Sequence, residues 1–142
     1  MGELNEVKQA GEKVALNALL AEDNEINAEI AKLQLEAMGF AVTWVENGAR
    51  AVESFGESEP GFYSLIIMDI MMPVMDGIQA THIIRNLERN DAKSVPIVAI
   101  SANTYPEDRE MSEKNGVSCF ITKPYSRKEF EKTVMTLVGE IK

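Results

Sequence analysis

The sequence predicts an α/β domain in which a parallel sheet carries helices on both faces. Five short apolar runs alternate along the chain with five stretches of helical periodicity. Strands of parallel sheets are buried on both faces, so continuous apolar runs of this kind are typical of them. The 142 residues fit one domain of common size, and 45% hydrophobic with 26% charged residues is an ordinary globular composition. We therefore expect a single core.

The five predicted strands are short and are bounded by polar or turn-forming residues. Their length and their aliphatic and β-branched side chains favour strands over helices. Because a helical stretch separates each pair of strands, parallel crossover connections are expected throughout. The predicted strands are residues 15–21, 40–45, 65–68, 97–100 and 117–122.

The first helix is predicted directly after the first strand, where apolar residues recur at helical spacing from Asn24 onward. Gly39 ends this helix in the manner of a left-handed C-terminal cap. The recurring apolar positions are Ile26, Ile30, Leu33 and Ala37.

The other four helices are predicted from caps and from the same periodicity. Asn47-Gly48 opens the second, Pro106 lies in the first turn of the fourth, and Ser126 caps the fifth. The fourth helix ends near Asn115 and has a thin apolar face. The apolar positions of the second, third and fifth helices are Ala51, Val52 and Phe55; Ile78, Ile83, Ile84 and Leu87; and Phe130, Val134, Leu137, Val138 and Ile141.

Charge and hydropathy exclude several classes of partner. Acidic residues outnumber basic ones by 23 to 14, for a net charge of −9, and no cluster of Lys and Arg offers a surface for nucleic acid. No apolar stretch approaches the roughly 20 residues that span a bilayer. The N-terminus has no signal-peptide pattern, so a cytoplasmic protein is expected. Residues 1–13 are polar and are interpreted as an extension or linker before a domain over residues 14–142.

Reactive or charged side chains follow four of the predicted strands. Glu22 and Asp23 follow the first, Asp69 the third, Ser101 the fourth and Lys123 the last. The carboxyl ends of parallel strands meet at one edge of the sheet, where ligands of such folds bind. The sequence therefore predicts a site assembled there from four loops.

The residue types indicate phosphoryl chemistry on a carboxylate. Glu22, Asp23 and Asp69 would repel one another unless a hard cation joined them, and Mg²⁺ prefers such oxygen ligands while leaving positions for a phosphate. Lys123 and the Ser101 hydroxyl would meet the remaining phosphoryl oxygens. Asp69 is the candidate nucleophile, because carboxylates form aspartyl-phosphates.

Taken together, these segments resemble the receiver domain of two-component response regulators, most closely the receivers attached to hybrid histidine kinases. The resemblance covers roughly residues 14 to 142, and four ordered motifs are far more specific than one. The motifs are LLAEDNEIN at 19–27, MDIMMPVMDG at 68–77, ISAN at 100–103 and TKP at 122–124.

The resemblance implies a flavodoxin-like (βα)5 fold, a doubly wound parallel sheet of five strands in the order 2-1-3-4-5. It implies Asp69 as phosphoacceptor and Mg²⁺ held by Asp23, Asp69 and the main-chain carbonyl of Met71, with Glu22 acting mainly through bound water. It also implies a cis peptide bond between Lys123 and Pro124.

The resemblance further implies a conformational switch. The hydroxyl of Ser101 would move toward the phosphoryl group, and the aromatic residue three positions before the lysine would change rotamer with it. That residue is Phe120 in this chain. Many relatives have tyrosine there, so a hydrogen bond from a phenolic hydroxyl is absent from the expected switch.

The implied function is signalling rather than turnover of a substrate. A histidine kinase or histidine phosphotransfer domain would donate the phosphoryl group from a phosphohistidine. Phosphorylation would then change the face of the fourth and fifth helices, which an output partner or a second copy would bind. The chain would be a stand-alone receiver, a relay module or part of a hybrid kinase that assists its own phosphorylation and dephosphorylation.

Less specific interpretations exist for each motif. Glu22 and Asp23 could cap the first helix, Asp76-Gly77 is typical of a turn and helix start, and His82 is expected on the surface. A Mg²⁺-dependent phosphohydrolase is an alternative, but it would need a second acid where Met71 lies. An FMN-binding flavodoxin-like module is another, although the acidic loop after the first strand would repel a phosphate.

Overall fold

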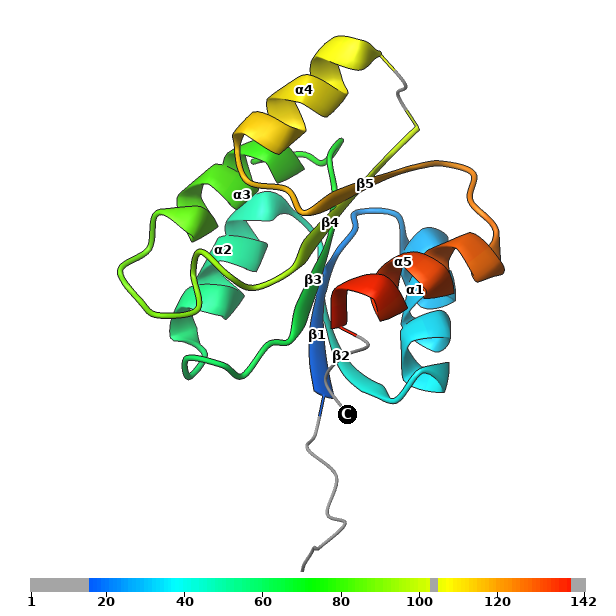
Figure 1. Ribbon diagram of the computed structural model, residues 1–142, viewed down its shortest axis with the longest axis horizontal. Helices are drawn as coiled ribbons and strands as arrows, with labels where there is room; N and C mark the ends of the chain where they lie inside the picture. Colours follow the sequence, from blue (N-terminus) through cyan, green and yellow to red (C-terminus); the bar gives the residue numbers. More distant parts are fainter. Residues whose placement is uncertain (1–15, 103–104, 139–142) are drawn as a thin grey trace, which may run out of the picture.

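The computed structural model describes residues 16–102 and 105–138. Five parallel strands form one sheet in the order β2-β1-β3-β4-β5, which confirms the predicted fold (Figure 1). The predicted extension over residues 1–13 and the predicted position Ile141 lie outside the described residues. The elements are β1 (Leu16–Ala21), α1 (Glu25–Ala37), β2 (Phe40–Val45), α2 (Gly48–Glu57), β3 (Leu65–Asp69), α3 (Gly77–Arg85), β4 (Ile97–Ser101), α4 (Pro106–Lys114), β5 (Cys119–Thr122) and α5 (Arg127–Val138).

Helices cover both faces of the sheet (Figure 1). Helices α1 and α5 pack on one face, where Leu35 and Phe130 are fully buried against β1, β3 and β4. Helices α2 and α3 pack on the other, where Phe55 and Ile84 are fully buried. Alternate residues of the central strands point into these two clusters, as a strand requires. The two-sided core explains why the predicted strands read as continuous apolar runs.

Helix α1 was located correctly by its apolar period, but that period does not mark its buried side. Ile26 is 72% exposed, Ile30 49% and Leu33 56%, and Ala37 is also exposed. The buried side consists of Ala28, Ala31 and Leu35. Small alanine side chains let the helix lie close to the sheet, and the larger residues are left on the solvent side. The apolar stripe of α1 is therefore a surface feature.

Strand β5 is shorter than predicted, because it begins at Cys119 and not at Val117. The amide of Val117 donates instead to the carbonyl of Ser112 at 3.1 Å, at the C-terminal end of α4. Ser118 then donates to the carbonyl of Ile97 at 2.8 Å. Val117 thus completes the turn out of α4, and Ser118 contacts the first residue of β4.

The loop between β3 and α3 is fixed by hydrogen bonds at its helical end. Asp76 caps α3 in a capping box with Gln79, which confirms the interpretation of Asp76-Gly77 as a helix start. The amide of Gly77 donates to the carbonyl of Ile70 at 2.9 Å, and the amide of Gly48 donates to that of Met75 at 2.9 Å. These contacts hold the loop against β3 and α2.

Arg89 connects the loop after α3 with the end of α2, at the edge of the sheet where β3 and β4 begin. Its guanidinium donates to both carboxylate oxygens of Asp91, at 2.7 and 3.1 Å, and to the carbonyls of Phe55 and Ser58 at 2.6 and 2.9 Å. It also lies 4.3 Å from the centre of the Phe55 ring. Both members of the pair are largely buried, and Asp91 also accepts from the amide of Gly61 at 2.8 Å.

We expect Arg89→Met to lower the free energy of unfolding by about 2 kcal/mol at neutral pH, because it leaves buried acceptors unpaired. The hydrogen bond from Arg89 lowers the pKa of Asp91. The stabilisation from Asp91 is therefore present above the ordinary pKa of an aspartate and is lost as pH falls through the lowered value. Urea denaturation at neutral pH and at about pH 3 measures both effects.

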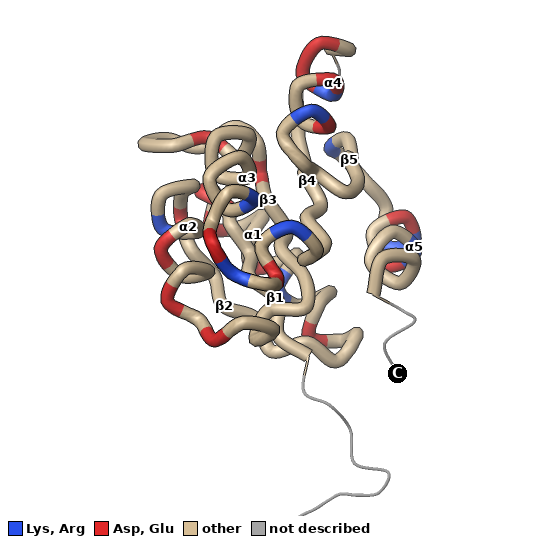
Figure 2. The backbone as a smooth tube through the Cα atoms, turned by 60° about the vertical axis from the view of Figure 1, so that its left-hand side comes forward, with Lys and Arg blue, Asp and Glu red and all other residues tan. Residues whose placement is uncertain are grey.

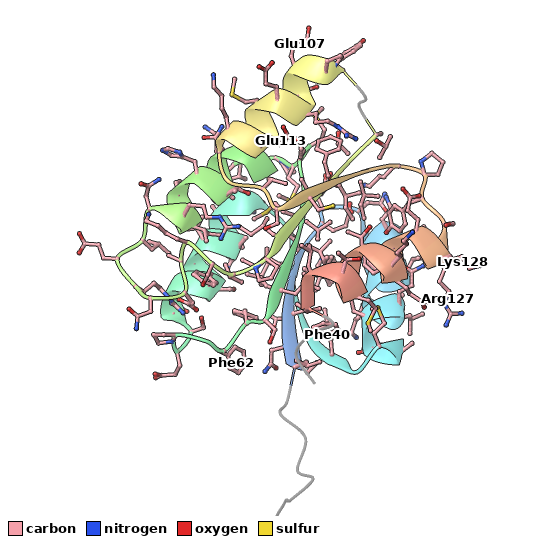
Figure 3. The ribbon with its side chains drawn as sticks, in the orientation of Figure 1. Phe40, Phe62, Glu107, Glu113, Arg127 and Lys128 are labelled. Carbon is pink, nitrogen blue, oxygen red and sulfur yellow. The ribbon has the colours of Figure 1, made fainter. Side chains whose placement is uncertain are left out.

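Arg127→Met is the matched control, since Arg127 contacts Glu131 on the exposed side of α5 at 2.8 Å (Figure 3). An exposed pair of this kind contributes less than about 0.5 kcal/mol. Equal losses in the two variants would contradict the anchoring role of Arg89.

Candidate functional site

Three carboxylates meet at the carboxyl ends of the strands. Glu22 directly follows β1, Asp23 lies in the turn before α1, and Asp69 is the last residue of β3. One ligand oxygen from each lies within 4.8 Å of the others. Glu22 and Asp69 are each only 5% exposed, whereas Asp23 faces solvent. The parallel register brings together the acids that the sequence places at strand ends.

Lys123 reaches the buried pair of carboxylates from the loop after β5. Its Nζ lies 3.3 Å from Glu22 Oε1 and 3.2 Å from Asp69 Oδ2. The backbone amide of Lys123 donates to the carbonyl of Ser101 at 2.8 Å, which ties this loop to the end of β4. The peptide bond between Lys123 and Pro124 is cis, as the resemblance implies.

The site has an excess of negative charge in a partly dry environment. Burial, followed by the hydrogen bond and the charge of Asp69, raises the pKa of Glu22 to about 7. Burial opposes the charge of Lys123, but the carboxylates of Asp69 and Glu22 outweigh it and raise the pKa of Lys123. One ammonium faces three carboxylates, so the site is suited to a further cation. Clustered carboxylate oxygens, one of them open to solvent, fit a hard divalent ion.

Main-chain groups orient the carboxylates. The amide of Met71 donates to Asp69 Oδ1 at 3.2 Å, and the amide of Asn24 donates to Glu22 Oε2 at 3.2 Å. The Met71 side chain is 64% exposed, so the backbone of this residue approaches the site while its side chain points away from the core. The structure thus places the backbone amide of Met71 beside the carboxylate of Asp69.

Ser101 and Phe120 lie on the two strands farthest from β1. Ser101 ends β4, is 1% exposed and pairs in register with Thr122 of β5. Phe120 is half-buried on β5, and Arg109 of α4 places its guanidinium carbon 4.9 Å from the centre of the Phe120 ring. Sequence reasoning did not single out Arg109, because helical spacing alone does not show which strand residue a helix covers.

Trp44 is a second residue at the site that sequence reasoning missed. Its indole Nε1 donates to the carbonyl oxygen of Glu22 at 2.7 Å. The available signal was the expected strand order, which places the strand of residues 40–45 next to the strand that ends before Glu22.

An open groove of about 440 Å³ borders the site between α1 and the loop after β5. Its lining is mostly apolar and includes Ile30 of the exposed α1 stripe and Lys123 of the site. The lining residues are Asn27, Ile30, Gln34, Ala102, Lys123, Pro124 and Tyr125.

The fold and this constellation of residues agree with a family match. Residues 18–135 match the model of the response regulator receiver domain. The chain therefore belongs to the response regulator receiver family, whose members are phosphoacceptors of two-component signalling.

Curated relatives extend the match to histidine kinases. The chain is 42% identical over 113 residues to the peroxide stress-activated histidine kinase mak1 of Schizosaccharomyces pombe, covering 79% of this chain and 7% of that protein. It is 35% identical over 127 residues to the sensor protein GacS of Pseudomonas syringae, covering 88% of this chain and 14% of that protein. The chain thus spans a small part of the length of these relatives.

A solved structure of a homologous receiver also matches. This is the receiver domain of a sensor histidine kinase from Pseudomonas aeruginosa, with a magnesium ion coordinated in its active-site cleft. The two chains are 34% identical with a TM-score of 0.79, covering 89% of this chain and 99% of the other.

The structure also bears on membranes and nucleic acids as partners. Within residues 16–102 and 105–138, no helix is long and apolar enough to cross a membrane. Over the same residues, Lys and Arg are interspersed with acidic residues and form no continuous basic stripe (Figure 2).

Proposed function

We propose that Asp69 accepts a phosphoryl group from a phosphohistidine in a reaction that depends on Mg²⁺. The observation that carries this proposal is the position of Asp69, buried among two further carboxylates and 3.2 Å from the ammonium of Lys123. An Asp69 oxygen would form the new bond to phosphorus while the bond from phosphorus to the imidazole nitrogen breaks, and the bonding electron pair leaves with the imidazole. The imidazole is a good leaving group, so positioning and charge compensation suffice.

The other residues would compensate the charge of the transferring group. Asp23, Asp69 and the Met71 carbonyl would hold Mg²⁺, with Glu22 contributing through bound water, and the ion would neutralise phosphoryl oxygens. Lys123 would leave the carboxylate of Asp69 to contact one phosphoryl oxygen, and the Ser101 hydroxyl would donate to another. Ser101, Asp69 and Lys123 are thus the proposed catalytic residues.

We expect Lys123→Met to slow phosphorylation of Asp69 by at least about tenfold, because a charge-assisted hydrogen bond to the transferring group is lost. The measurement is the initial rate of adduct formation with acetyl phosphate and Mg²⁺. Lys128→Met is the control, since Lys128 lies on the exposed start of α5 away from the cluster (Figure 3). A Lys123→Met variant that reacts at the wild-type rate would contradict the proposed role.

The phosphodonor would dock on the exposed stripe of α1. Ile26, Ile30 and Leu33 are about half exposed or more and recur at the spacing of one helix face. The stripe continues into the groove that Lys123 lines, so a bound partner would lie beside the phosphoacceptor. A helix that carries the phosphohistidine fits this surface, because helices recognise apolar stripes at this spacing.

The switch would run from the site to the face of α4, β5 and α5. Ser101 and Phe120 would reposition when Asp69 is phosphorylated, and Arg109 would lose or change its contact with the Phe120 ring. An output partner or a second copy of the chain would bind the altered face.

The whole protein would be a hybrid histidine kinase in the cytoplasm or with its receiver facing the cytoplasm. This rests on the relatives, which are named histidine kinases and of which the chain covers 7% and 14%. Its cognate donor would be the kinase domain itself or a separate phosphotransfer domain.

Intact-mass measurement with acetyl phosphate tests the proposed function. We expect an adduct of about 80 Da that requires Mg²⁺ and disappears with hydroxylamine. Release of p-nitrophenol from p-nitrophenyl phosphate distinguishes a phosphohydrolase, and we expect no sustained turnover. Absence of the adduct under rapid quenching, or sustained ester hydrolysis, would overturn the proposal.

A further inference from the structure

The single tryptophan of the chain lies on the edge strand β2 and contacts the backbone of the metal site. The indole Nε1 of Trp44 donates to the carbonyl oxygen of Glu22 at 2.7 Å. The amide of Glu22 donates to the carbonyl of Val45 at 3.0 Å. Strand β2 therefore forms hydrogen bonds with both the N–H and the C=O group of Glu22.

The carbonyl that Trp44 holds belongs to the peptide bond between Glu22 and Asp23. These two residues supply two of the three carboxylates in the cluster. Leu20 pairs in register with Trp44 and Ala21 with Val45, so the strand pairing ends just where the turn begins. The hydrogen bond from the indole extends the contacts of β2 by one peptide group beyond the strand pairing. It thereby fixes the orientation of the peptide group that precedes Asp23.

Packing alone does not account for this tryptophan. The residue is 38% exposed on an edge strand, and it belongs to neither buried core cluster. Its one polar group is directed at the turn, with a short hydrogen bond. The N–H group thus gives this partly exposed tryptophan a polar contact with the turn that another aromatic side chain such as phenylalanine would not make.

We infer that Trp44 is a positioning residue for the divalent cation and sets the affinity of the site for Mg²⁺. The inference rests on the proposed function, in which Asp23 and Asp69 bind the ion. The hydrogen bond preorganises the turn, so the free protein pays less to order the carboxylates when the ion binds. The same contact makes the indole a reporter of ion binding.

Isothermal titration with Mg²⁺ alone tests the inference in the wild-type chain and in Trp44→Phe. Phenylalanine keeps an aromatic ring on the strand and removes the N–H donor. We expect Mg²⁺ to bind Trp44→Phe about fivefold more weakly, the equivalent of one net hydrogen bond. We also expect the wild-type tryptophan emission to change with Mg²⁺ and to saturate at the calorimetric dissociation constant.

A second variant separates the hydrogen bond from packing. Incorporation of 3-benzothienylalanine at position 44 keeps the shape of the indole and replaces only the N–H group by sulfur. We expect this variant to bind Mg²⁺ as weakly as Trp44→Phe while its melting temperature stays near the wild-type value. Phe62→Leu is the control, because Phe62 is an exposed aromatic residue at the opposite end of the sheet (Figure 3). Its Mg²⁺ affinity should not change.

The outcomes distinguish failure of the inference from failure of the proposed function. The positioning role would be overturned if both position-44 variants bound Mg²⁺ with wild-type affinity. It would also be overturned if the tryptophan emission of the wild-type chain did not change when Mg²⁺ binds. A wild-type chain that does not bind Mg²⁺ at all would overturn the proposed function itself. A lower melting temperature with unchanged affinity would assign Trp44 a structural role only and would also overturn the inference.

Discussion

Asp69→Asn is expected to abolish the phosphoryl adduct that the wild-type chain forms with acetyl phosphate and Mg²⁺. Asparagine keeps the size and one oxygen of the side chain, but an amide is not a nucleophile toward phosphorus at neutral pH. The substitution also removes one negative charge from a buried cluster in which Asp69 helps to raise the pKa of Glu22. The variant should therefore fold at least as stably as the wild type. Intact mass and urea denaturation measure the two effects.

Asp76→Asn is the matched control for that experiment. Asp76 lies at the far end of the loop that follows Asp69 and has the same side chain, but its carboxylate accepts from the amide of Gln79 at 2.8 Å as the N-terminal cap of α3. Asparagine is an equally good cap, so stability and adduct formation should both persist. An adduct in Asp69→Asn, or its loss in Asp76→Asn, would show that Asp69 is not the acceptor.

Gly77→Ala, at the first residue of α3, is expected to destabilise the fold more than alanine at either glycine of α2, Gly48 or Gly56. A Cβ atom at residue 77 would clash with the carbonyl oxygen of Asp69 and would lie 2.8 Å from Met68 Cγ. The carbonyl oxygen of Asp69 belongs to the backbone and cannot move aside by side-chain rotation, so the loop must shift. We expect a loss of about 3 kcal/mol in the free energy of unfolding. The shift also moves the peptide that follows Asp69, so adduct formation should slow.

Gly56→Ala is the control for this substitution. Gly56 lies in α2, is exposed, and has no atom within 4 Å of the position that a Cβ would take. Alanine in a helix is favoured over glycine, so we expect a gain of about 0.5 kcal/mol with normal phosphorylation. Tolerance of Gly77→Ala to the same degree would contradict the close packing of the loop against Asp69.

Much of the fold was predictable because local signals and tertiary packing agree. The run from Leu65 to Met68 lies between β1 and β4 and is buried on both faces. Its continuous apolar sequence is therefore the one expected of a central strand. Gly39 has a φ of 101°, which explains why glycine ends α1. Periodicity failed on the buried face of α1, where Ala28 and Ala31 face the sheet and Ile26 faces solvent. An exposed apolar stripe on a helix has the same sequence pattern as a buried one.

The residues of the site that lie at strand ends could be predicted from the sequence. Glu22, Asp69 and Lys123 were expected at one edge of the sheet, and the ammonium of Lys123 does contact both carboxylates. Trp44 and Arg109 were not found, because each acts through contact with another element and lies in no recognisable motif. The expected strand order places Trp44 near Glu22 but does not show its hydrogen bond, and the contact of Arg109 with the Phe120 ring follows from three-dimensional packing alone.

The rival functions also differ in physical terms. An FMN-binding module needs a loop that attracts phosphate after β1, whereas Glu22 and Asp23 there belong to an acidic cluster. A phosphohydrolase of this kind needs a second acid two residues after the nucleophile to protonate the leaving group, and this chain has Met71 at that position. A phosphohistidine donor has no such need, because its leaving group is an imidazole.

Locating the phosphoryl group on the chain tests directly whether Asp69 is the phosphoacceptor. Borohydride reduction of the acetyl-phosphate-treated protein converts an aspartyl-phosphate to homoserine, and fragmentation of the peptide that spans β3 and α3 identifies the residue. We predict homoserine at position 69 only, dependent on Mg²⁺ during phosphorylation. Homoserine at Asp23 or Asp76, or a phosphoryl group retained on His82, would contradict this prediction.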